Sequence, residues 1–297
     1  MKAHEGKHNA VRMTAALRVS RSGYYRSRSG RTSPRAAEDK ELRERIVSIH
    51  QESRETYGSP RITLELRKES IRLGKNRVAR LMREAGISGV GRRRRMVRTT
   101  RSDERLPVAP NRLKGLDITD PNQAWAADIT YVGTDEGWGY LAAVMDMWSR
   151  KIVGWSFKSH METSLVADAL KNALHTRRPG KGLIHHSDRG SQYASSEYRQ
   201  LLEHHEIEAS MSAKGNCYDN ATMESFFGTL KSEEIHRRIY RTQAEARREI
   251  FHYIESFYNL KRNHTSLEGW SPEEFESKNL FSPAGENKFS SATAELA

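Results

Sequence analysis

Cysteine is nearly absent from the 297 residues of the sequence, because Cys217 is the single thiol. One thiol excludes an internal disulfide and a cysteine-rich zinc site. Long apolar runs are missing too, and no stretch is long enough to cross a bilayer, so we expect no membrane partner. The basic N-terminus lacks the apolar stretch of a secretory signal. No phosphate-binding glycine loop with Lys-Ser or Lys-Thr is present. These absences favour an intracellular protein that does not use ATP.

Positive charge is concentrated in the first third of the chain. Residues 1–110 hold 28 Lys and Arg against 12 Asp and Glu, whereas residues 111–297 hold 22 against 26. A basic block favours polyphosphate partners, because each neutralised phosphate releases counterions. A solvated, disordered basic tail is the alternative. Helical periodicity in the same segment favours a nucleic-acid partner.

The basic segment has the pattern of a helix-turn-helix at about residues 57–87. Ser59-Pro60 reads as a helix start, with a capping hydroxyl followed by proline at the first helical position. A glycine-containing break separates it from a helix at 76–85, where Arg77, Arg80 and Arg83 point largely outward. We expect these arginines to contact DNA, although many helical hairpins bind nothing. Upstream, the periodicity predicts two short helices within 10–28 and a stronger one at 36–54.

Four consecutive arginines follow the predicted hairpin, and prolines then end any regular element. These arginines either only increase solubility or lie along the phosphate backbone of DNA. In the second case the residues that contact DNA are Arg92, Arg93, Arg94 and Arg95. The sequence thus predicts four divisions. A basic helical DNA-binding region spans residues 1–105 and a linker spans 106–122. A catalytic core with C-terminal helices spans 123–276, and a tail spans 277–297.

The pattern changes to alternating strands and helices from Gln123 onward. Strands are predicted at 124–132, 138–148, 151–158, 182–187 and 208–213. Helices are predicted at 163–177, 195–206, 220–239 and 243–261. The last of these begins with a capping box made by Thr242 and Glu245. This order predicts a mixed α/β layer fold, with a small all-α region before it.

Three carboxylates stand out in this α/β part. Asp128 lies in an apparent central strand, where aspartate is depleted and a buried carboxylate is costly. Asp188 ends a strand, and ligands bind at the carboxyl ends of strands in open α/β sheets. Glu224 shares a helix face with Lys231. Each also has an ordinary explanation: an exposed strand end, a turn aspartate and a solvent-facing glutamate.

The three carboxylates are more informative together, because two strands and a helix can bring them to one point. Hard oxygen ligands of this kind suit Mg²⁺ or Mn²⁺. Two such ions, about 3.5–4 Å apart, would activate the attacking oxygen and stabilise the leaving one. Asp128, Asp188 and Glu224 are therefore the predicted catalytic and metal-binding residues.

Four short stretches make the sequence recognisable. They read NQAWAADITY, DMWSRKIVGW, HHSDRGSQY and DNATMESFFGTLK, and 35 residues separate Asp188 from Glu224. YGSPRI and NRVARLMREAGI upstream, and FYNLKRNHTSLEGWSP near the end, also match. The chain resembles the transposases of bacterial insertion sequences of the IS-three type, in particular the product of their second reading frame. The resemblance runs from about residue 14 to 276.

The resemblance implies a fold and an activity. The fold is a ribonuclease-H-like, integrase-type core with a mixed five-stranded sheet. The activity is metal-dependent cleavage at the 3′ ends of an insertion sequence in DNA, followed by strand transfer, with catalysis by Asp128, Asp188 and Glu224. The resemblance also implies that Asp146 is not a metal ligand. Two rivals remain open: a nuclease of the same core that does not join strands, and a DNA-binding regulator with an inactive core.

The expected partners are double-stranded DNA, at the element's ends and at its target, and further copies of the chain. Joining two ends implies at least two protomers, and an upstream-frame protein is a further expected partner or fusion. The expected location is the bacterial cytoplasm, with the nucleoid.

Several other polar side chains are of interest. Lys231 and Gln192 are candidate DNA contacts. Adjacent strand residues point to opposite faces, so His185 and His186 should not bind one ion together. His186 either lines the site or simply packs. Asp146 is expected to pair with Arg150. Arg262 and His264 match family positions, but the sequence does not indicate what they do.

Overall fold

The computed structural model describes residues 9–28, 34–91, 109–212 and 220–280. The chain forms two compact units, Met1–Ser88 and Gly89–Ala297. The arginines at 92–95 lie outside the described residues, so their predicted contact with DNA stays a prediction. Within the described residues, no helix combines the length and apolar character that crossing a membrane requires.

The first unit is helical, as the periodicity predicts. Its helices are α1 (Ala10–Ala16), α2 (Arg21–Arg28), α3 (Pro34–Glu52), α4 (Ser59–Lys68) and α5 (Lys75–Glu84). Ile46, Ile62 and Val78, one from each of the last three helices, are fully buried and form a small shared core with their neighbours. The predicted hairpin is α4 and α5. The predicted capping role of Ser59 is wrong, because Gly58 is the N-cap and makes no side-chain bond.

A five-stranded mixed sheet forms the centre of the second unit, with strand order β3-β2-β1-β4-β5. The strands are β1 (Ala124–Thr134), β2 (Gly137–Asp146), β3 (Ile152–Lys158), β4 (Ile184–Ser187) and β5 (Glu208–Met211). The first three form an antiparallel meander, and β4 and β5 run parallel to β1. The predicted mixed sheet is confirmed, and the element order agrees with the predicted alternation.

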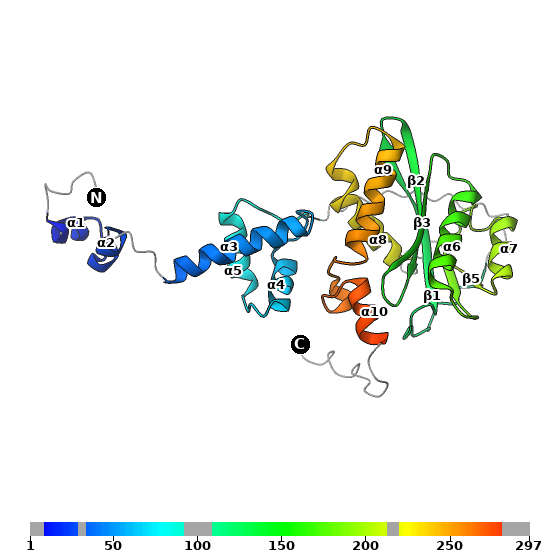
Figure 1. The fold of residues 1–297 in the computed structure, drawn as a ribbon, viewed down its shortest axis with the longest axis horizontal. Coiled ribbons are helices and arrows are strands. Elements are labelled where there is room, and N and C mark those ends of the chain that lie inside the picture. The colour runs from blue at the N-terminus through cyan, green and yellow to red at the C-terminus, as the bar shows by residue number, and fades with distance from the viewer. Residues whose placement is uncertain (1–8, 29–33, 92–108, 213–219, 281–297) are drawn as a thin grey trace. The chain divides into compact units, whose positions relative to one another are not determined.

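Helices cover both faces of this sheet. In Figure 1, α6 (Thr163–Arg177) and α7 (Ser196–His204) lie on one side, and α8 (Ala221–Glu233) and α9 (Gln243–Phe251) lie on the other. Alanines of α6 let the helix approach β3 closely. A Cβ built on Gly154 would be 2.4 Å from the Ala169 carbonyl oxygen. Glycine at 154 therefore permits this close contact between helix and sheet.

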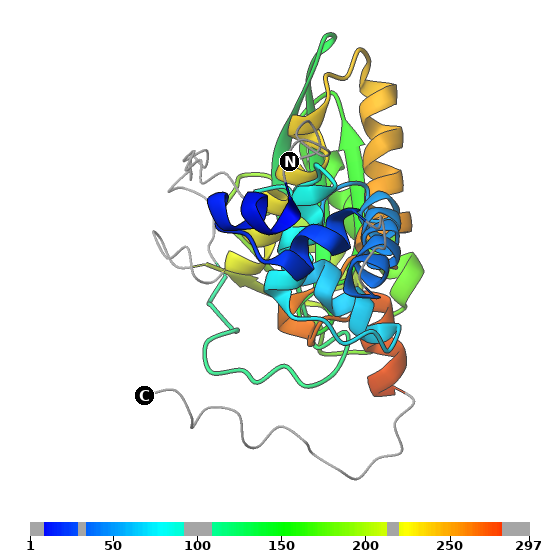
Figure 2. The ribbon, with the colours of Figure 1, turned by 90° about the vertical axis from the view of Figure 1, so that its left-hand side faces the viewer.

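The hairpin of β1 and β2 projects at one end of the second unit, beside the turn that precedes α9 (Figure 2). Asp135 donates its backbone N–H to the Tyr240 carbonyl at 3.0 Å, and Gln243 donates its own to Glu136 at 2.7 Å. Half of the capping box predicted for α9 is confirmed, since the Thr242 side chain accepts the Glu245 N–H, but the Glu245 carboxylate accepts the N–H of Arg241 instead of that of Thr242. The helix predicted at 243–261 changes to a π-helix at His252–Tyr258.

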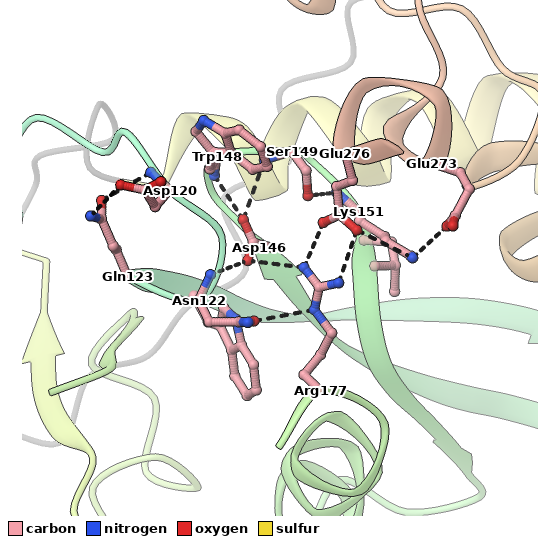
Figure 3. Close-up of polar contacts among 12 residues, drawn as sticks. Asp120, Asn122, Gln123, Asp146, Trp148, Ser149, Lys151, Arg177, Glu273 and Glu276 are labelled. Carbon is pink, nitrogen blue, oxygen red and sulfur yellow. Dashed lines mark hydrogen bonds and ion pairs between the residues drawn. The ribbon is translucent and has the colours of Figure 1, made fainter. Parts of the chain in front are cut away.

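Asp146 is the centre of a buried polar network (Figure 3). Its carboxylate is fully buried and accepts backbone N–H groups from Asn122, Trp148 and Ser149 at 2.7–3.2 Å. Its ionic partner is Arg177 of α6, at 3.4 Å. The expected side-chain pairing with Arg150 is therefore wrong. Arg150 instead donates its backbone N–H to the Asp146 carbonyl at 2.8 Å.

Arg177 also joins α10 (Pro272–Leu280) to the network through Glu276. Burial alone would raise the pKa of Glu276, but hydrogen bonds from Arg177 bring that pKa below its ordinary value. Lys151 pairs with Glu276 at 3.4 Å and with Glu273 as well. The network thus joins β2, the start of β3, α6 and α10 through charges that satisfy one another.

A second buried pair holds the helices on the other side of the sheet. Arg262 donates through Nε and a terminal nitrogen to both oxygens of Glu233, at 2.7 and 2.8 Å. Tyr253 donates its hydroxyl to the same carboxylate at 2.8 Å. Both partners of the ion pair are almost fully buried. The family position Arg262 therefore acts as a structural partner of α8.

Candidate active site

The parallel pairing of β1 and β4 brings the two predicted aspartates together. Ala126 is in register with His186. The register continued by two residues sets Asp128 level with Asp188, which directly follows the last residue of β4. Neighbouring strands are about 4.8 Å apart, so this continuation would bring the two aspartates close together just beyond the paired part of the sheet.

Asp128 shows the electrostatic effect of this arrangement. Burial, then the negative charge of Asp188, and then more weakly that of Glu224, raise the pKa of Asp128 to about 7. A hydrogen bond from the Ile129 N–H at 2.7 Å and the charge of Lys231 oppose this rise only in part. All three predicted carboxylates are therefore close enough to interact.

Glu224 comes from the first turn of α8, a helix that packs against β1. Its side chain is exposed, whereas Met223 and Phe226 of the same helix are buried in the core. Lys231 lies two turns further along α8 and is half-buried. Burial lowers the pKa of its ammonium, and the charge of Asp128 opposes that effect. Lys231 thus supplies positive charge close to the carboxylates.

Gly190 positions Asp188 from the loop that follows β4. Its N–H donates to Oδ1 of Asp188 at 2.9 Å, and a Cβ at this residue would be 3.0 Å from the same oxygen. The carboxylate therefore fits against a backbone that has no side chain. In the sequence, only the presence of glycine two residues after Asp188 hints at this role.

The two histidines before Asp188 point to opposite faces of β4, as predicted. His185 contacts the Tyr198 hydroxyl of α7 at 3.0 Å through Nε2. His186 is fully buried and contacts the hydroxyls of Ser210 and Ser212 at 2.8 and 3.0 Å. Of the two alternatives for His186, these contacts support packing between β4 and the end of β5.

The candidate DNA contacts have different surroundings. Gln192 donates to the Met161 carbonyl at 3.1 Å. Arg77 and Arg80 of α5 are not simply outward, because each pairs with Asp39 of α3 at 2.7 Å. Arg83 is exposed on α5. The predicted contact of these residues with DNA stays a prediction, but two of the three candidate arginines of α5 already share the Asp39 carboxylate.

A metal ion would need donors at coordination distance. Among the residues that the structure describes, no three His, Cys, Asp or Glu side chains meet that condition. The three side chains nonetheless suit a hard divalent cation, because all three offer carboxylate oxygens. The raised pKa of Asp128 shows that negative charge is crowded there, and a cation would relieve it.

Comparison with known proteins gives consistent matches along the chain. A family model described as an integrase core domain matches residues 118–217, and a second with the same description matches residues 224–280. An HTH-like domain model matches residues 37–95. These matches include all three predicted carboxylates and the predicted hairpin.

Two curated relatives match nearly the whole chain. The IS600 uncharacterized 31 kDa protein of Shigella sonnei is 45% identical over 267 residues, covering 90% of this chain and 98% of the relative. Transposase InsF for insertion sequence IS3A, from Escherichia coli K12, is 41% identical over 280 residues, covering 93% of this chain and 97% of the relative.

Solved structures resemble the chain only loosely. A chain of the simian T-cell lymphotropic virus intasome is 14% identical, with a TM-score of 0.46. The match covers 84% of this chain and 80% of that chain. The catalytic core domain of BIV integrase is 16% identical, with a TM-score of 0.41. The match covers 54% of this chain and 97% of that chain. The family itself follows from the two relatives and the integrase core models. The chain belongs to the IS3-type family of insertion-sequence transposases, and its second unit is the ribonuclease-H-like integrase core of a DNA transposase.

Proposed function

We propose that Asp128, Asp188 and Glu224 are the catalytic residues of this transposase and that together they hold Mg²⁺ or Mn²⁺. One observation supports the proposal most: the pKa of Asp128 rises to about 7 through burial and the charges of Asp188 and Glu224, and the β1–β4 pairing at Ala126 and His186 ends two residues before the two aspartates. A carboxylate in that position is expensive to ionise without a cation. Two divalent ions bound there would activate the attacking oxygen and stabilise the leaving oxygen.

The proposed reaction has two phosphoryl-transfer steps. In the first, water adds to a phosphorus at the element's end, the bond from that phosphorus to the 3′ oxygen breaks, and a free 3′-OH results. In the second, this 3′ oxygen forms a bond to another DNA phosphorus, and the oxygen previously bonded there leaves. Neither step needs a serine, cysteine or tyrosine nucleophile from the protein.

The side chains of the site would orient these steps. The Gly190 N–H donates to Oδ1 of Asp188, and this bond would help to orient the carboxylate. Lys231 would hold a non-bridging phosphate oxygen, since its ammonium already lies near Asp128. Gln192 would contact the DNA strand after leaving the Met161 carbonyl.

DNA recognition is assigned to the first unit and to the basic segment that follows it. We propose that α4 and α5 form the helix-turn-helix, with exposed Arg83 toward DNA, and that residues 92–95 contact phosphates. Joining two ends requires at least two protomers, so a homo-oligomer forms on DNA, and an upstream-frame protein completes end recognition. The proposed setting is the bacterial cytoplasm, at the nucleoid.

The test uses the full chain with labelled DNA that carries the element's ends, with Mg²⁺ and then with EDTA. Glu224→Gln keeps the size of the side chain but removes its charge. Joining should fall by more than about 100-fold, which is the upper end of the loss seen when only a supporting group of a metal site is removed. DNA binding should persist. Glu203→Gln, at an exposed glutamate of α7, is the matched control and should keep full activity.

The other outcomes discriminate the rivals. Cutting without joining in the unmodified chain would favour a nuclease. Binding with no chemistry, also after the upstream-frame protein is added, would favour the inactive regulator. Joining that survives in Glu224→Gln would refute the proposed triad.

A further inference from the structure

A cavity of about 190 Å³ lies beside the catalytic carboxylates, between α7 and the face of β4 and β5 that carries His185. It is separate from the proposed metal site, because neither Asp128 nor Glu224 lines it. Its wall is made by three groups of residues. The strands give His185, Ser187, Ala209, Ser210 and Met211. The helix gives Tyr198, Arg199 and Leu202. Two more come from loops, Ala109 and Tyr193.

Two hydrogen-bond donors of this wall have no partner among the described residues. They are the hydroxyl of Tyr193 and the Nε–H of Arg199, and both atoms are buried. The neighbouring polar pair is satisfied, because the Tyr198 hydroxyl and His185 meet at 3.0 Å. Buried donors are normally bonded, so these two indicate a group that presents acceptors to them.

The rest of the wall defines the chemistry of that group. A guanidinium is always charged and is matched in geometry to a carboxylate. No described residue that lines the cavity is acidic, and burial lowers the pKa of His185 to about 4, so Arg199 is the only cation of the wall at neutral pH. Ala109, Leu202, Ala209 and Met211 supply apolar surface to the same wall. We propose that this cavity binds a small organic carboxylate, with its charged end on Arg199 and Tyr193 and its apolar body among the aliphatic side chains.

The cavity has a direct relation to the active site. Burial, the neighbouring Tyr198, and the charges of Asp128 and Asp188 together raise the pKa of Tyr193 well above its ordinary value. Its hydroxyl therefore keeps its proton and remains a donor. Ser187, on the wall, directly precedes Asp188. A ligand held by Tyr193 would thus occupy the back of the strand that positions a catalytic aspartate.

The proposal is tested with benzoate as the probe and benzamide as its neutral equivalent, on the metal-free full chain. Tryptophan fluorescence follows thermal unfolding of the second unit, because all five tryptophans lie between residues 125 and 270. Benzoate should raise the midpoint, and benzamide should not. Arg199→Met should lower the benzoate affinity by about tenfold or more, and Tyr193→Phe by about threefold, as expected for a charged and a neutral hydrogen bond. Arg247→Met, at an exposed arginine of α9, should leave it unchanged.

Three results would overturn the proposal. One is an equal shift with benzoate and benzamide, and another is a benzoate shift that survives in Arg199→Met. The third is an equal shift with inorganic phosphate at matched ionic strength, which would mean a simple anion site. Tyr193→Phe loses only a hydroxyl that has no partner among the described residues, so it should fold even if Arg199→Met does not.

Discussion

Replacing Asp128 by asparagine should stabilise the metal-free protein above neutral pH while abolishing its chemistry. The carboxylate is crowded by burial and by two further negative charges, which together raise its pKa to about 7. Asparagine has nearly the same shape, and its side-chain oxygen can still accept the Ile129 N–H. The substitution therefore removes a charge that destabilises the fold and keeps the bond that stabilises it.

The magnitude follows from the difference in pKa between the folded and unfolded states. A pKa of about 7 against the ordinary 3.8 corresponds to about 4 kcal/mol, since one pK unit is about 1.4 kcal/mol. Between pH 4 and 7 the folded protein keeps a proton that the unfolded chain has lost, so stability of the unmodified protein falls as pH rises. Above pH 7 both states are ionised and the penalty is constant. Asparagine does not titrate, so the variant's advantage should grow from near zero to about 4 kcal/mol across this window.

Urea unfolding followed by tryptophan fluorescence, in EDTA at pH 5 and pH 8, measures this advantage for the second unit. Asp117→Asn, at an exposed aspartate, is the control and should change stability by less than about 0.5 kcal/mol. Mg²⁺ at 100 times its Kd should add about 2.7 kcal/mol to the unmodified protein at pH 8 and little to the variant. An advantage that is equal at both pH values, or a variant less stable than the parent at pH 8, would refute the reasoning.

Two further substitutions test the packing that supports the site, again by urea unfolding. Arg262→Met removes the guanidinium that pairs with the buried Glu233 carboxylate and should cost about 3–5 kcal/mol. Adding Glu233→Gln should recover part of that loss, and no recovery would contradict a charge-based role. Gly154→Ala forces a methyl group against the Ala169 carbonyl and should cost roughly 1–3 kcal/mol or more. Gly180→Ala is its control, because no described residue lies within 4 Å of a Cβ built there, and equal effects at both glycines would contradict the close contact.

Local sequence patterns predicted most of the elements, because each strand and helix buries a face with its own period. The predicted strand at 124–132 differs from β1 by two residues at one end, for example. Residue patterns singled out the three carboxylates and the resemblance agreed with them, and the parallel pairing of β1 with β4 then explains how two residues 60 positions apart come close together. The segment predicted at 243–261 is less regular than its pattern, since the π-helix that replaces its second half has no distinct sequence period.

Long-range pairing was the part that the sequence did not predict. Asp146 pairs with Arg177 of α6 rather than with nearby Arg150, because the fold brings α6 to the end of β2. From the sequence, Arg77 and Arg80 were predicted to form an exposed basic face, but in the structure both pair with Asp39 of α3. Sequence patterns carry no information about partners that are distant along the chain. They therefore predicted that each charged side chain pairs with the nearest opposite charge or faces solvent.

The Asp146 network also has a consequence for how the protein is made. Its members come from residues 146, 177 and 276, so its last carboxylate leaves the ribosome long after the sheet has been synthesised. Until then Asp146 and Arg177 lack Glu276, and the second unit must close through contacts between distant parts of the chain, which form slowly. We therefore expect the network to be completed only after residue 276 has been synthesised, so that the last step of folding of the second unit follows the synthesis of α10.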